Sequence, residues 1–303
     1  MEVAIKVGSL TKRYGKVTAL DGVSFDVARG ELFGLIGPDG AGRTTLFRLL
    51  TTLLNPDEGR AEVDGCDIVR DYRAIRARAG YMPGRFSLYP DLSVEENLDF
   101  FAALFGVGVK DNYDLIAPIY RQIEPFRTRR AGKLSGGMKQ KLALCCALIH
   151  RPSVLFLDEP TTGVDAVSRS EFWDMLAELR SKGISILVST PYMDEALRCD
   201  RIALINEGRI LSIDTPHGIV GRFDEPLYEL SGADMYGLLL AARRSPDVRE
   251  CYPFGAVHHL IPSGEFDAAR FVRELSDRGF RGAELRPAEA GIEDVFIKLM
   301  RHE

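Results

Sequence analysis

The pattern of apolar and polar positions changes several times along the chain, and each change predicts a different element. Apolar residues alternate with polar ones at 23–27, which predicts a half-buried strand, and a second strand is predicted at 31–36. Leucines then recur at helical spacing in 43–53, and Asn55-Pro56 is expected to end that helix. The chain therefore begins with β-structure and continues into a strand, loop and helix unit.

A helical region is predicted between the first strands and the next ones. Ser93 and Glu96 have the spacing of a capping box in front of the apolar run 98–105, and the polar sequence up to residue 133 is expected to be mostly helical. We place this helical insertion at about 85–150.

Strands resume after this insertion. Continuous apolar runs at 154–157 and 184–189 are typical of strands in a parallel sheet that is covered on both faces. A helix predicted at 168–180 joins them, so the pattern indicates a βαβ crossover.

The pattern changes once more after Pro216. The expected order is strand 226–231, helix 234–244, strands 248–252 and 256–261, helix 267–278, strand 281–286 and a closing helix from 291. This βαββαβ order predicts a small α+β, ferredoxin-like domain. We therefore expect two domains, at 1–215 and 216–303.

Composition narrows the class of protein. The chain has 303 residues, of which 46% are hydrophobic and 27% charged, and its net charge is −5. These values exclude a disordered chain and give no basic surface for nucleic acid. No apolar run approaches the roughly 18 residues of a membrane span, and the first ten residues lack the pattern of a secretory signal. We expect a cytoplasmic protein.

The cysteines and the adjacent histidines suggest packing more than chemistry. The five cysteines are scattered without metal-ligand spacing, and Cys145-Cys146 falls in an apolar helical stretch, so buried thiols are expected. His258 and His259 are consecutive in a predicted strand and should therefore point to opposite faces of the sheet.

A glycine-rich segment follows the strand at 31–36. It reads Gly37-Pro38-Asp39-Gly40-Ala41-Gly42-Arg43-Thr44-Thr45 and opens the predicted helix. Glycines allow backbone N–H groups to turn toward phosphate oxygens, and the helix N-terminus adds positive potential. Thr44 is placed to offer its hydroxyl to Mg²⁺. A structural glycine-rich turn is the alternative, because the usual motif has lysine at the position of Arg43.

Two further motifs point to one family. Leu134-Ser135-Gly136-Gly137-Met138 precedes Val154-Leu155-Phe156-Leu157-Asp158-Glu159-Pro160 by about 20 residues. With them, residues 1–215 resemble the ATP-binding subunits of ABC transporters. The tail ends in Gly291-Ile292-Glu293-Asp294-Val295-Phe296 and resembles the accessory domain of subunits that work with separate export permeases. The resemblance implies an α/β P-loop NTPase fold of the ABC type, with a mixed sheet.

The resemblance also implies ATP and Mg²⁺ as ligands and assigns roles within the site. Tyr14 matches the aromatic residue that stacks on adenine. Asp158 would orient Mg²⁺, together with Thr44, and Glu159 would act as general base on the attacking water. A buried acidic pair without such a task would be costly, which favours these roles.

Other matching residues imply a dimer. Ser135, Gly136 and Gly137 match the motif that reaches the γ-phosphate held by a partner subunit, and Asp165 matches the loop that crosses between the two sites. The resemblance therefore implies a head-to-tail homodimer or heterodimer that encloses two ATP molecules. It also implies a separate transmembrane permease subunit, with this chain bound peripherally at the inner face of the membrane.

Three positions depart from the family pattern. Arg43 replaces the loop lysine, Gly84 replaces a glutamine, and Pro191 replaces a histidine that contacts the γ-phosphate. Proline offers neither a side-chain donor nor a backbone N–H. We therefore hypothesise that this chain's own site hydrolyses ATP slowly while its Ser135 motif completes a partner's site. Sufficient catalysis by Glu159 alone stays open as an alternative.

Two readings of function follow from the sequence. The first is an ABC-type ATPase subunit that drives a membrane exporter, with residues 85–105 as the docking surface. Phe86, Leu88 and Tyr89 belong to that surface, or else they are ordinary core residues. The second is a nucleotide-gated pseudo-ATPase or soluble ABC-type assembly module without a permease.

Overall fold

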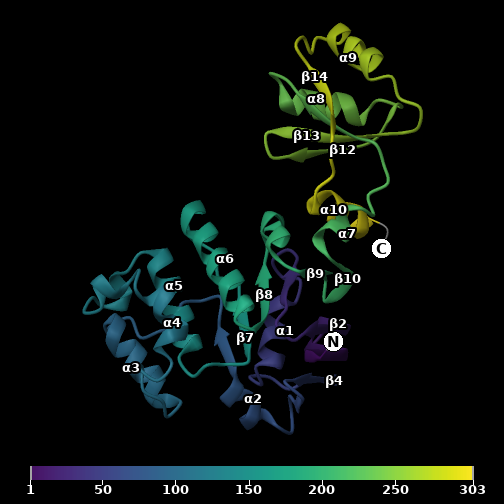
Figure 1. The fold of residues 1–303 in the computed structure, drawn as a ribbon. Helices are drawn as coiled ribbons and strands as arrows, with labels where there is room; N and C mark the ends of the chain where they lie inside the picture. The colour runs from purple at the N-terminus through teal and green to yellow at the C-terminus, as the bar shows by residue number, and fades with distance from the viewer. Residues whose placement is uncertain (1, 302–303) are drawn as a thin grey trace. The chain divides into compact units, whose positions relative to one another are not determined.

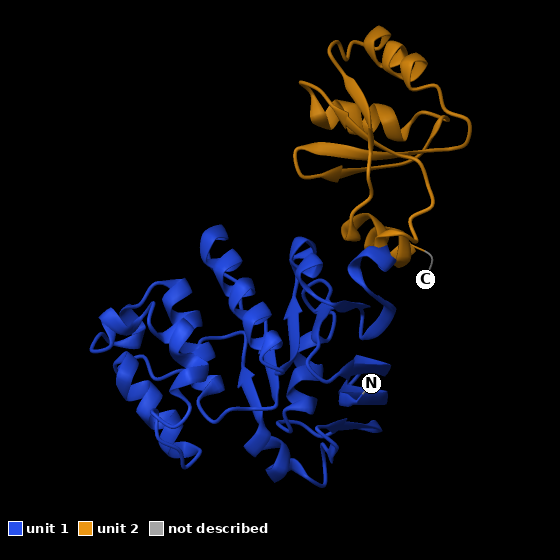
Figure 2. Ribbon diagram, in the orientation of Figure 1, with its two compact units in different colours: residues 1–219, 302–303 blue, residues 220–301 orange. Residues whose placement is uncertain are grey.

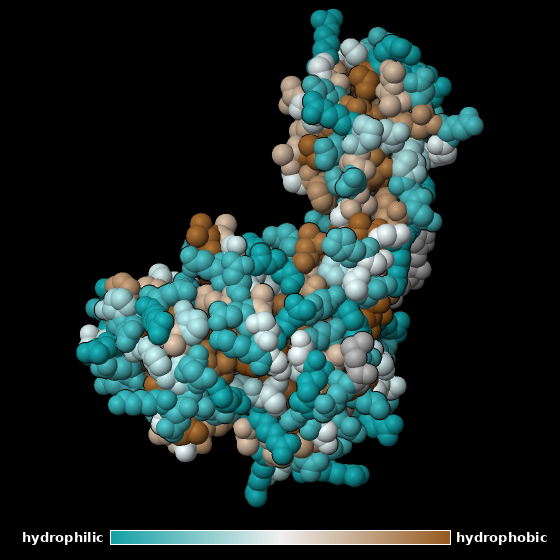
Figure 3. Space-filling model, in the orientation of Figure 1, coloured by the Kyte–Doolittle hydropathy of each residue, from teal (hydrophilic) through white to brown (hydrophobic). Residues whose placement is uncertain are grey.

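The computed structural model describes residues 2–301, which form two compact units. Residues 2–219 make up the first unit and residues 220–301 the second (Figures 1 and 2). Hydrophilic residues dominate the face drawn in Figure 3, and apolar residues form separate patches on it. Among residues 2–301, no helix combines the length and the apolar character that a membrane span requires.

The first unit is built around a mixed six-stranded sheet with the order β10-β9-β3-β8-β7-β6. Its strands are β3 (Leu32–Ile36), β6 (Ala79–Met82), β7 (Val154–Asp158), β8 (Ser185–Thr190), β9 (Arg201–Asn206) and β10 (Arg209–Asp214). Five strands are parallel, and β10 pairs antiparallel at one edge. Every residue of β3, β7 and β8 is buried, as expected for central strands covered on both faces.

A second, antiparallel sheet supplies much of the core. It has the order β2-β1-β4-β5, with strands β1 (Val3–Tyr14), β2 (Val17–Ala28), β4 (Glu58–Val63) and β5 (Cys66–Asp67). Helix α1 (Arg43–Leu50) packs in one core with residues of both sheets, since Phe47 of α1 belongs to the same cluster as Phe25 of β2 and Phe156 of β7. The two sheets therefore hold the start of α1 in place from both sides.

Helices cover the rest of this unit. They are α2 (Tyr72–Arg78), α3 (Val94–Leu104), α4 (Tyr113–Tyr120), α5 (Gly136–Leu148), α6 (Ala166–Ser181) and α7 (Pro216–Val220). Helices α3 and α4 both contact α5 (Figure 1). The capping box is confirmed, because the Ser93 hydroxyl accepts from the backbone N–H of Glu96 while the Glu96 carboxylate accepts from that of Ser93.

Two sequence-based boundaries were wrong. The helix expected at 43–53 ends at Leu50, and Thr52 adopts a left-handed backbone conformation with φ of 63°. The region up to residue 133 is less helical than expected, because between α4 and α5 it contains only two single-turn 3₁₀ helices, at Glu124–Phe126 and Ala131–Lys133. Leu53 continues the apolar spacing past the end of α1, and the polar sequence after α4 carries no apolar spacing that would mark where helix stops, so the pattern alone located neither end.

The second unit has the expected element order. It consists of β11 (Leu227–Ser231), α8 (Met235–Arg243), β12 (Val248–Phe254), β13 (Val257–Pro262), α9 (Ala268–Asp277), β14 (Glu284–Ala288) and α10 (Ile292–Arg301). The sheet is fully antiparallel with the order β12-β13-β11-β14. This order is that of a ferredoxin-like sheet, and α8 and α9 supply Leu238 and Phe271 to its main core.

His258 and His259 serve the two faces of this sheet. The His258 Nε2 atom lies 2.7 Å from the Met235 carbonyl oxygen of α8. The His259 Nδ1 atom lies 2.6 Å from Asp294 Oδ1 of α10. The adjacent histidines therefore point to opposite faces, as the strand geometry predicts.

Asp294 fastens α10 to the sheet through a buried hydrogen-bond cluster. Its carboxylate accepts from His259, from the Tyr252 hydroxyl at 2.7 Å and from the Gly291 backbone N–H at 2.7 Å. Burial raises the pKa of Asp294, but the hydrogen bonds from His259, Gly291 and Tyr252 outweigh it, so the pKa is lowered overall. The charged carboxylate is therefore the form that stabilises the fold.

We predict that Asp294→Asn destabilises the protein by about 3 kcal/mol, because it removes the charge at the centre of a buried network. The contribution of Asp294 is fully present above the ordinary aspartate pKa of about 4 and is lost as pH falls toward its lowered folded-state pKa. Urea denaturation between pH 7 and pH 3 measures both effects. The neighbouring exposed acid gives the control, since Glu293→Gln should cost less than about 1 kcal/mol. Equal losses in the two variants would contradict the assignment.

Candidate nucleotide-binding site

The glycine-rich segment 37–45 forms a cradle between the end of β3 and the start of α1. A side chain at Gly37 would place its Cβ 2.1 Å from the Ile205 carbonyl oxygen, and one at Gly42 would lie 2.3 Å from the Ala19 carbonyl oxygen. Gly42 also has a φ of 100° and precedes α1 without a side-chain cap. Glycine is therefore required by space as well as by backbone conformation, and the first N–H groups of α1 are left for an anion.

Two neighbouring cavities open over this cradle. One, of about 240 Å³, is lined by Tyr14, Ala19, Pro38, Gly40, Ala41, Gly42, Arg43, Thr44, Thr45 and Glu159. The other, of about 420 Å³, is lined by Thr44, Arg48, Tyr81, Pro83, Gly84, Arg85, Asp158 and Glu159. Thr44 and Glu159 line both cavities. The structure therefore brings most of the predicted site residues together, including Tyr14 from the distant β1.

Asp158 and Glu159 stand at the end of β7 and are positioned by β8. The Ser189 hydroxyl donates to Asp158 Oδ1 at 2.7 Å and accepts from the Glu159 backbone N–H at 3.0 Å. Burial raises the pKa of Asp158, and hydrogen bonds from Ser189 and Thr44 partly oppose this rise. The hydroxyl of Thr44 and the carboxylate of Asp158 therefore lie within hydrogen-bond reach, and both are oxygen ligands of the kind that Mg²⁺ takes.

Glu159 has an unusual backbone conformation. Its φ is 50°, in the left-handed region that few non-glycine residues adopt. The backbone is held there by its N–H, which also points toward the Ser189 carbonyl oxygen at 3.1 Å. Such strain is typical of functional sites, because it directs a side chain that a relaxed strand end would not present.

Arg43 does not point into open solvent from the loop. Its guanidinium Nη1 donates to the Pro38 carbonyl oxygen at 3.0 Å, and its Nη2 pairs with Glu159 Oε1 and lies 3.4 Å from Asp39 Oδ1. A cation therefore stays in the loop, as in the usual motif, but it is already bound to a carboxylate.

The other two departures from the family pattern differ in position. Gly84 lines the larger cavity, where a Cβ atom would lie 3.1 Å from the Asp158 carbonyl oxygen. Pro191 follows Thr190 at the end of β8 but lines neither of the two cavities among the described residues. A side chain at position 84 would therefore press on the Asp158 backbone, and Pro191 adds no polar group near the acidic pair.

The remaining predicted residues lie together at a separate place. Ser135 caps α5, and Asp165 caps α6 by accepting from the Ser168 backbone N–H at 3.0 Å. Gly137 lies against Ser168, whose hydroxyl oxygen is 2.8 Å from the position of an added Cβ. Neither cavity is lined by Ser135, Gly136, Gly137 or Asp165 within residues 2–301. Within one chain, the phosphate cradle and the group around Ser135 and Asp165 are thus two separate surfaces.

Glu195 is a buried residue that supports the site from outside the two cavities, and sequence reasoning missed it. This buried carboxylate accepts from the Thr161 hydroxyl at 2.8 Å, from Arg169 Nε at 3.0 Å and from the Thr190 hydroxyl at 2.5 Å. It therefore joins the segment after Glu159 to the end of β8 and to α6. An acid four residues after Pro191 was the available signal, but only the fold shows that it is buried.

A glycine cradle at a helix start, next to a buried acid that ends a parallel strand, defines a P-loop nucleotide-binding protein. Residues 20–162 match the family model described as ABC transporter. The chain is 42% identical over 217 residues to the probable multidrug ABC transporter ATP-binding protein YbhF of Escherichia coli (strain K12), covering 71% of this chain but only 38% of that protein.

A second relative matches along its whole length. The chain is 41% identical to the Nod factor export ATP-binding protein I of Paraburkholderia xenovorans (strain LB400), covering 100% of this chain and 98% of the relative. The structure of cbiO1 from Clostridium perfringens, part of the ABC transporter complex cbiONQ, is similar with a TM-score of 0.66 and 27% identity, covering 73% of this chain and 92% of that one. The chain belongs to the ABC transporter family, as an ATP-binding protein of the ABC ATPase type. The expected fold class and resemblance are confirmed.

We predict that Glu195→Gln destabilises the first unit by about 2 kcal/mol, because the new amide presents donors to hydroxyls that need an acceptor and leaves Arg169 without a buried counter-charge. Asp194→Asn is the matched control, since Asp194 pairs with the same arginine at 3.1 Å but its side chain is largely exposed. That variant should change stability by less than about 1 kcal/mol. Urea denaturation of both full-length variants compares the two, and similar losses would argue against the role of Glu195.

Proposed function

We propose that this chain is the peripheral ATP-binding subunit of a membrane exporter, and that a separate permease carries the transported molecule. The family membership and the name of the full-length relative, a Nod factor export ATP-binding protein, support an export role. The observation that carries the proposal is an apolar groove beside the nucleotide site. In this proposal the permease contacts the groove at the cytoplasmic face of the membrane.

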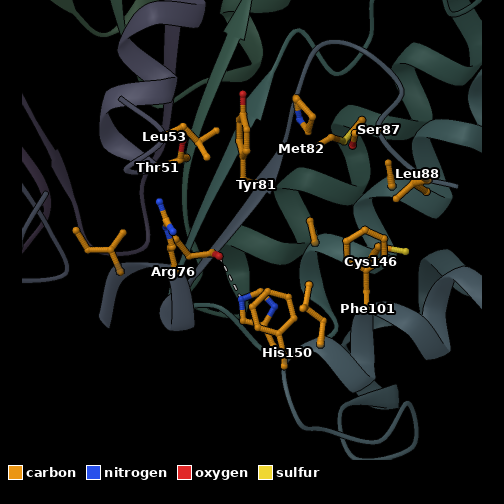
Figure 4. A pocket seen from close by; sticks show the side chains of 17 residues that line it. Thr51, Leu53, Arg76, Tyr81, Met82, Ser87, Leu88, Phe101, Cys146 and His150 are labelled. Atoms are coloured by element: carbon orange, nitrogen blue, oxygen red, sulfur yellow. Dashed lines mark hydrogen bonds between the residues drawn. The ribbon is translucent and has the colours of Figure 1, made fainter. Parts of the chain in front are cut away.

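The groove has a volume of about 640 Å³ and is drawn in Figure 4. Its 17 lining residues come from α2, β6, α3 and α5 and from the segments that follow α1, β6, α3 and α5: Thr51, Leu53, Ile75, Arg76, Ala79, Tyr81, Met82, Pro83, Ser87, Leu88, Phe101, Leu104, Phe105, Ala143, Cys146, Ala147 and His150. Most are apolar or aromatic, and Leu53 and Leu104 are exposed at its edge. An apolar helix of a permease loop would bury this surface.

The groove adjoins the nucleotide site directly. Tyr81 and Pro83 line both the groove and the cavity that contains Asp158 and Glu159. Gly84 follows these residues at once and lines that same cavity. A shift of Tyr81 and Pro83 on nucleotide binding would therefore change the shape of the groove in which the permease segment lies. Motion passed to the permease is the output of this proposal.

The chemistry follows from the residues over the cradle. The Tyr14 ring would stack on adenine, and the N–H groups of 37–45 would hold the phosphates. Thr44 and Asp158 would hold Mg²⁺, which supplies neutralising charge to the phosphate oxygens. Glu159 would take a proton from the water whose oxygen attacks the γ-phosphorus. The bond from the γ-phosphorus to the bridging oxygen then breaks, and ADP leaves with that electron pair.

A second ATP-binding subunit is needed to complete each site. Ser135, Gly136, Gly137 and Asp165 lie together but away from this chain's own cradle. In a head-to-tail dimer they would face the γ-phosphate in the partner's cradle. The dimer would be formed by two copies of this chain or by this chain and a related subunit.

We further propose that this chain's own site turns over slowly. Arg43 is bound to Glu159, Gly84 offers no side chain beside the acidic pair, and Pro191 offers no donor. The Ser135 motif keeps its helix-start geometry, so it can still complete a partner's site.

We predict that the triple variant Arg43→Lys, Gly84→Gln, Pro191→His raises ATP turnover of the purified chain by at least about tenfold, because it restores the donors that the site lacks. Steady-state phosphate release measures this effect. Adding Glu159→Gln to the triple variant should abolish the gain. Fast turnover in the unmodified chain would refute the slow-site proposal.

We predict that Leu104→Asp prevents co-purification with the proposed permease, because it places a charge at the edge of the groove, where Leu104 is 64% exposed. Tyr236→Asp is the control, since Tyr236 is 72% exposed on the second unit. Detergent extraction followed by affinity purification compares them. Unchanged association of the Leu104 variant would contradict docking at the groove, whereas no association of the unmodified chain would favour a protein that works without a permease.

A further inference from the structure

The guanidinium of Arg43 is buried inside the phosphate loop. The residue is only 4% exposed, and its guanidinium contacts the Pro38 carbonyl oxygen, the Glu159 carboxylate and, at 3.4 Å, the exposed Asp39 carboxylate. Its Nε is buried and has no hydrogen-bond partner within residues 2–301. The cation that should attract phosphate is therefore already neutralised by an internal anion.

Glu159 is engaged at both of its oxygens. Oε1 pairs with Arg43, and Oε2 accepts from the Thr162 hydroxyl at 3.3 Å. The guanidinium and the hydroxyl therefore occupy the two oxygens that a general base would use. Arg43 must leave Oε1 before that oxygen can accept a proton from a water molecule.

Both members of this pair face the same small cavity. Arg43 and Glu159 line the 240 Å³ space over the cradle, together with Gly40, Gly42 and Thr44. The first backbone N–H groups of α1 face this space, and the first turn of α1 contains no acidic residue that would compete for them. A phosphate that enters it would meet these donors and would compete with Glu159 for the guanidinium.

We propose that nucleotide binding exchanges the partner of Arg43, from Glu159 in the free protein to a phosphate oxygen in the bound one. This inference rests on the proposed role of Glu159 as general base. The exchange replaces one anion by another, so that the buried guanidinium is never left unpaired. It also makes release of the base a consequence of nucleotide occupancy, and it reduces nucleotide affinity because the internal pair must first be broken.

Arginine suits this exchange better than lysine would. Its planar fork donates to Pro38 and to Glu159 at the same time through two different nitrogens. An ammonium is a compact point charge and lacks this fixed two-sided geometry. The internal pair with Glu159 therefore depends on Arg43, the residue that replaces the lysine of the usual motif.

A double-mutant cycle on full-length protein tests the exchange. ADP affinity, measured by calorimetry without Mg²⁺, should rise about tenfold in Glu159→Gln, since the competing charge is gone. In the Arg43→Met background, which has neither charge nor donor, the same change should have less than a twofold effect. Equal effects in both backgrounds would overturn the proposal, because they would reflect general charge relief.

Two further readouts keep the test decisive. Asp39→Asn removes a carboxylate that is 91% exposed and 3.4 Å from the same guanidinium, and it should raise ADP affinity less than Glu159→Gln does. In nucleotide-free protein, Glu159→Gln should lower the melting temperature when Arg43 is present. The same change should leave the melting temperature unchanged in the Arg43→Met background. A fall in both backgrounds, or in neither, would contradict the pair even if ADP binding to Arg43→Met is too weak to measure. None of these measurements requires a permease, so they fail independently of the transport proposal.

Discussion

The parallel arrangement of the central strands is the constraint on which the site depends. Strands β3, β7 and β8 run in one direction, and β8 lies between the other two. Their carboxyl ends therefore meet at one edge, where the glycine cradle follows β3 and Asp158-Glu159 end and follow β7. Ser189 pairs in register with both neighbours and holds the two acids through its hydroxyl and carbonyl. The burial of all three strands keeps this edge fixed.

Buried acidic groups and one buried arginine lie close together at this edge of the sheet. Burial raises the pKa of Asp158, and burial together with the nearby Asp158 raises the pKa of Tyr81 to about 12. The charge of Arg43 opposes part of the rise at Asp158, and the same guanidinium pairs with Glu159. Tyr81 also forms the wall between the nucleotide cavity and the apolar groove, so electrostatic change and packing change share one boundary. The proposed coupling between nucleotide and permease rests on that shared boundary.

Much of the architecture could be predicted because local rules and the fold agree. The Ser93 capping box, the buried strands at 154–157 and 184–189, and the βαββαβ order of the second unit all appear where the pattern places them. The end of α1 was missed, because Leu53 continues the helical spacing beyond the last helical residue, Leu50. Apolar spacing reports which residues can face a core, whereas a helix end depends on the backbone contacts that follow it.

Residue types at fixed spacing are enough to predict the glycine-rich loop, the acidic pair, the family and the residues that depart from its pattern. The pairing of Arg43 with Glu159, the link from Thr161 to Thr190 through Glu195, and the contact of Asp294 with the sheet of the second unit could be found only in the folded chain. These contacts join residues whose partners are set by strand order and burial. Spacing along the chain carries no information about such distances, since they arise when separate elements pack.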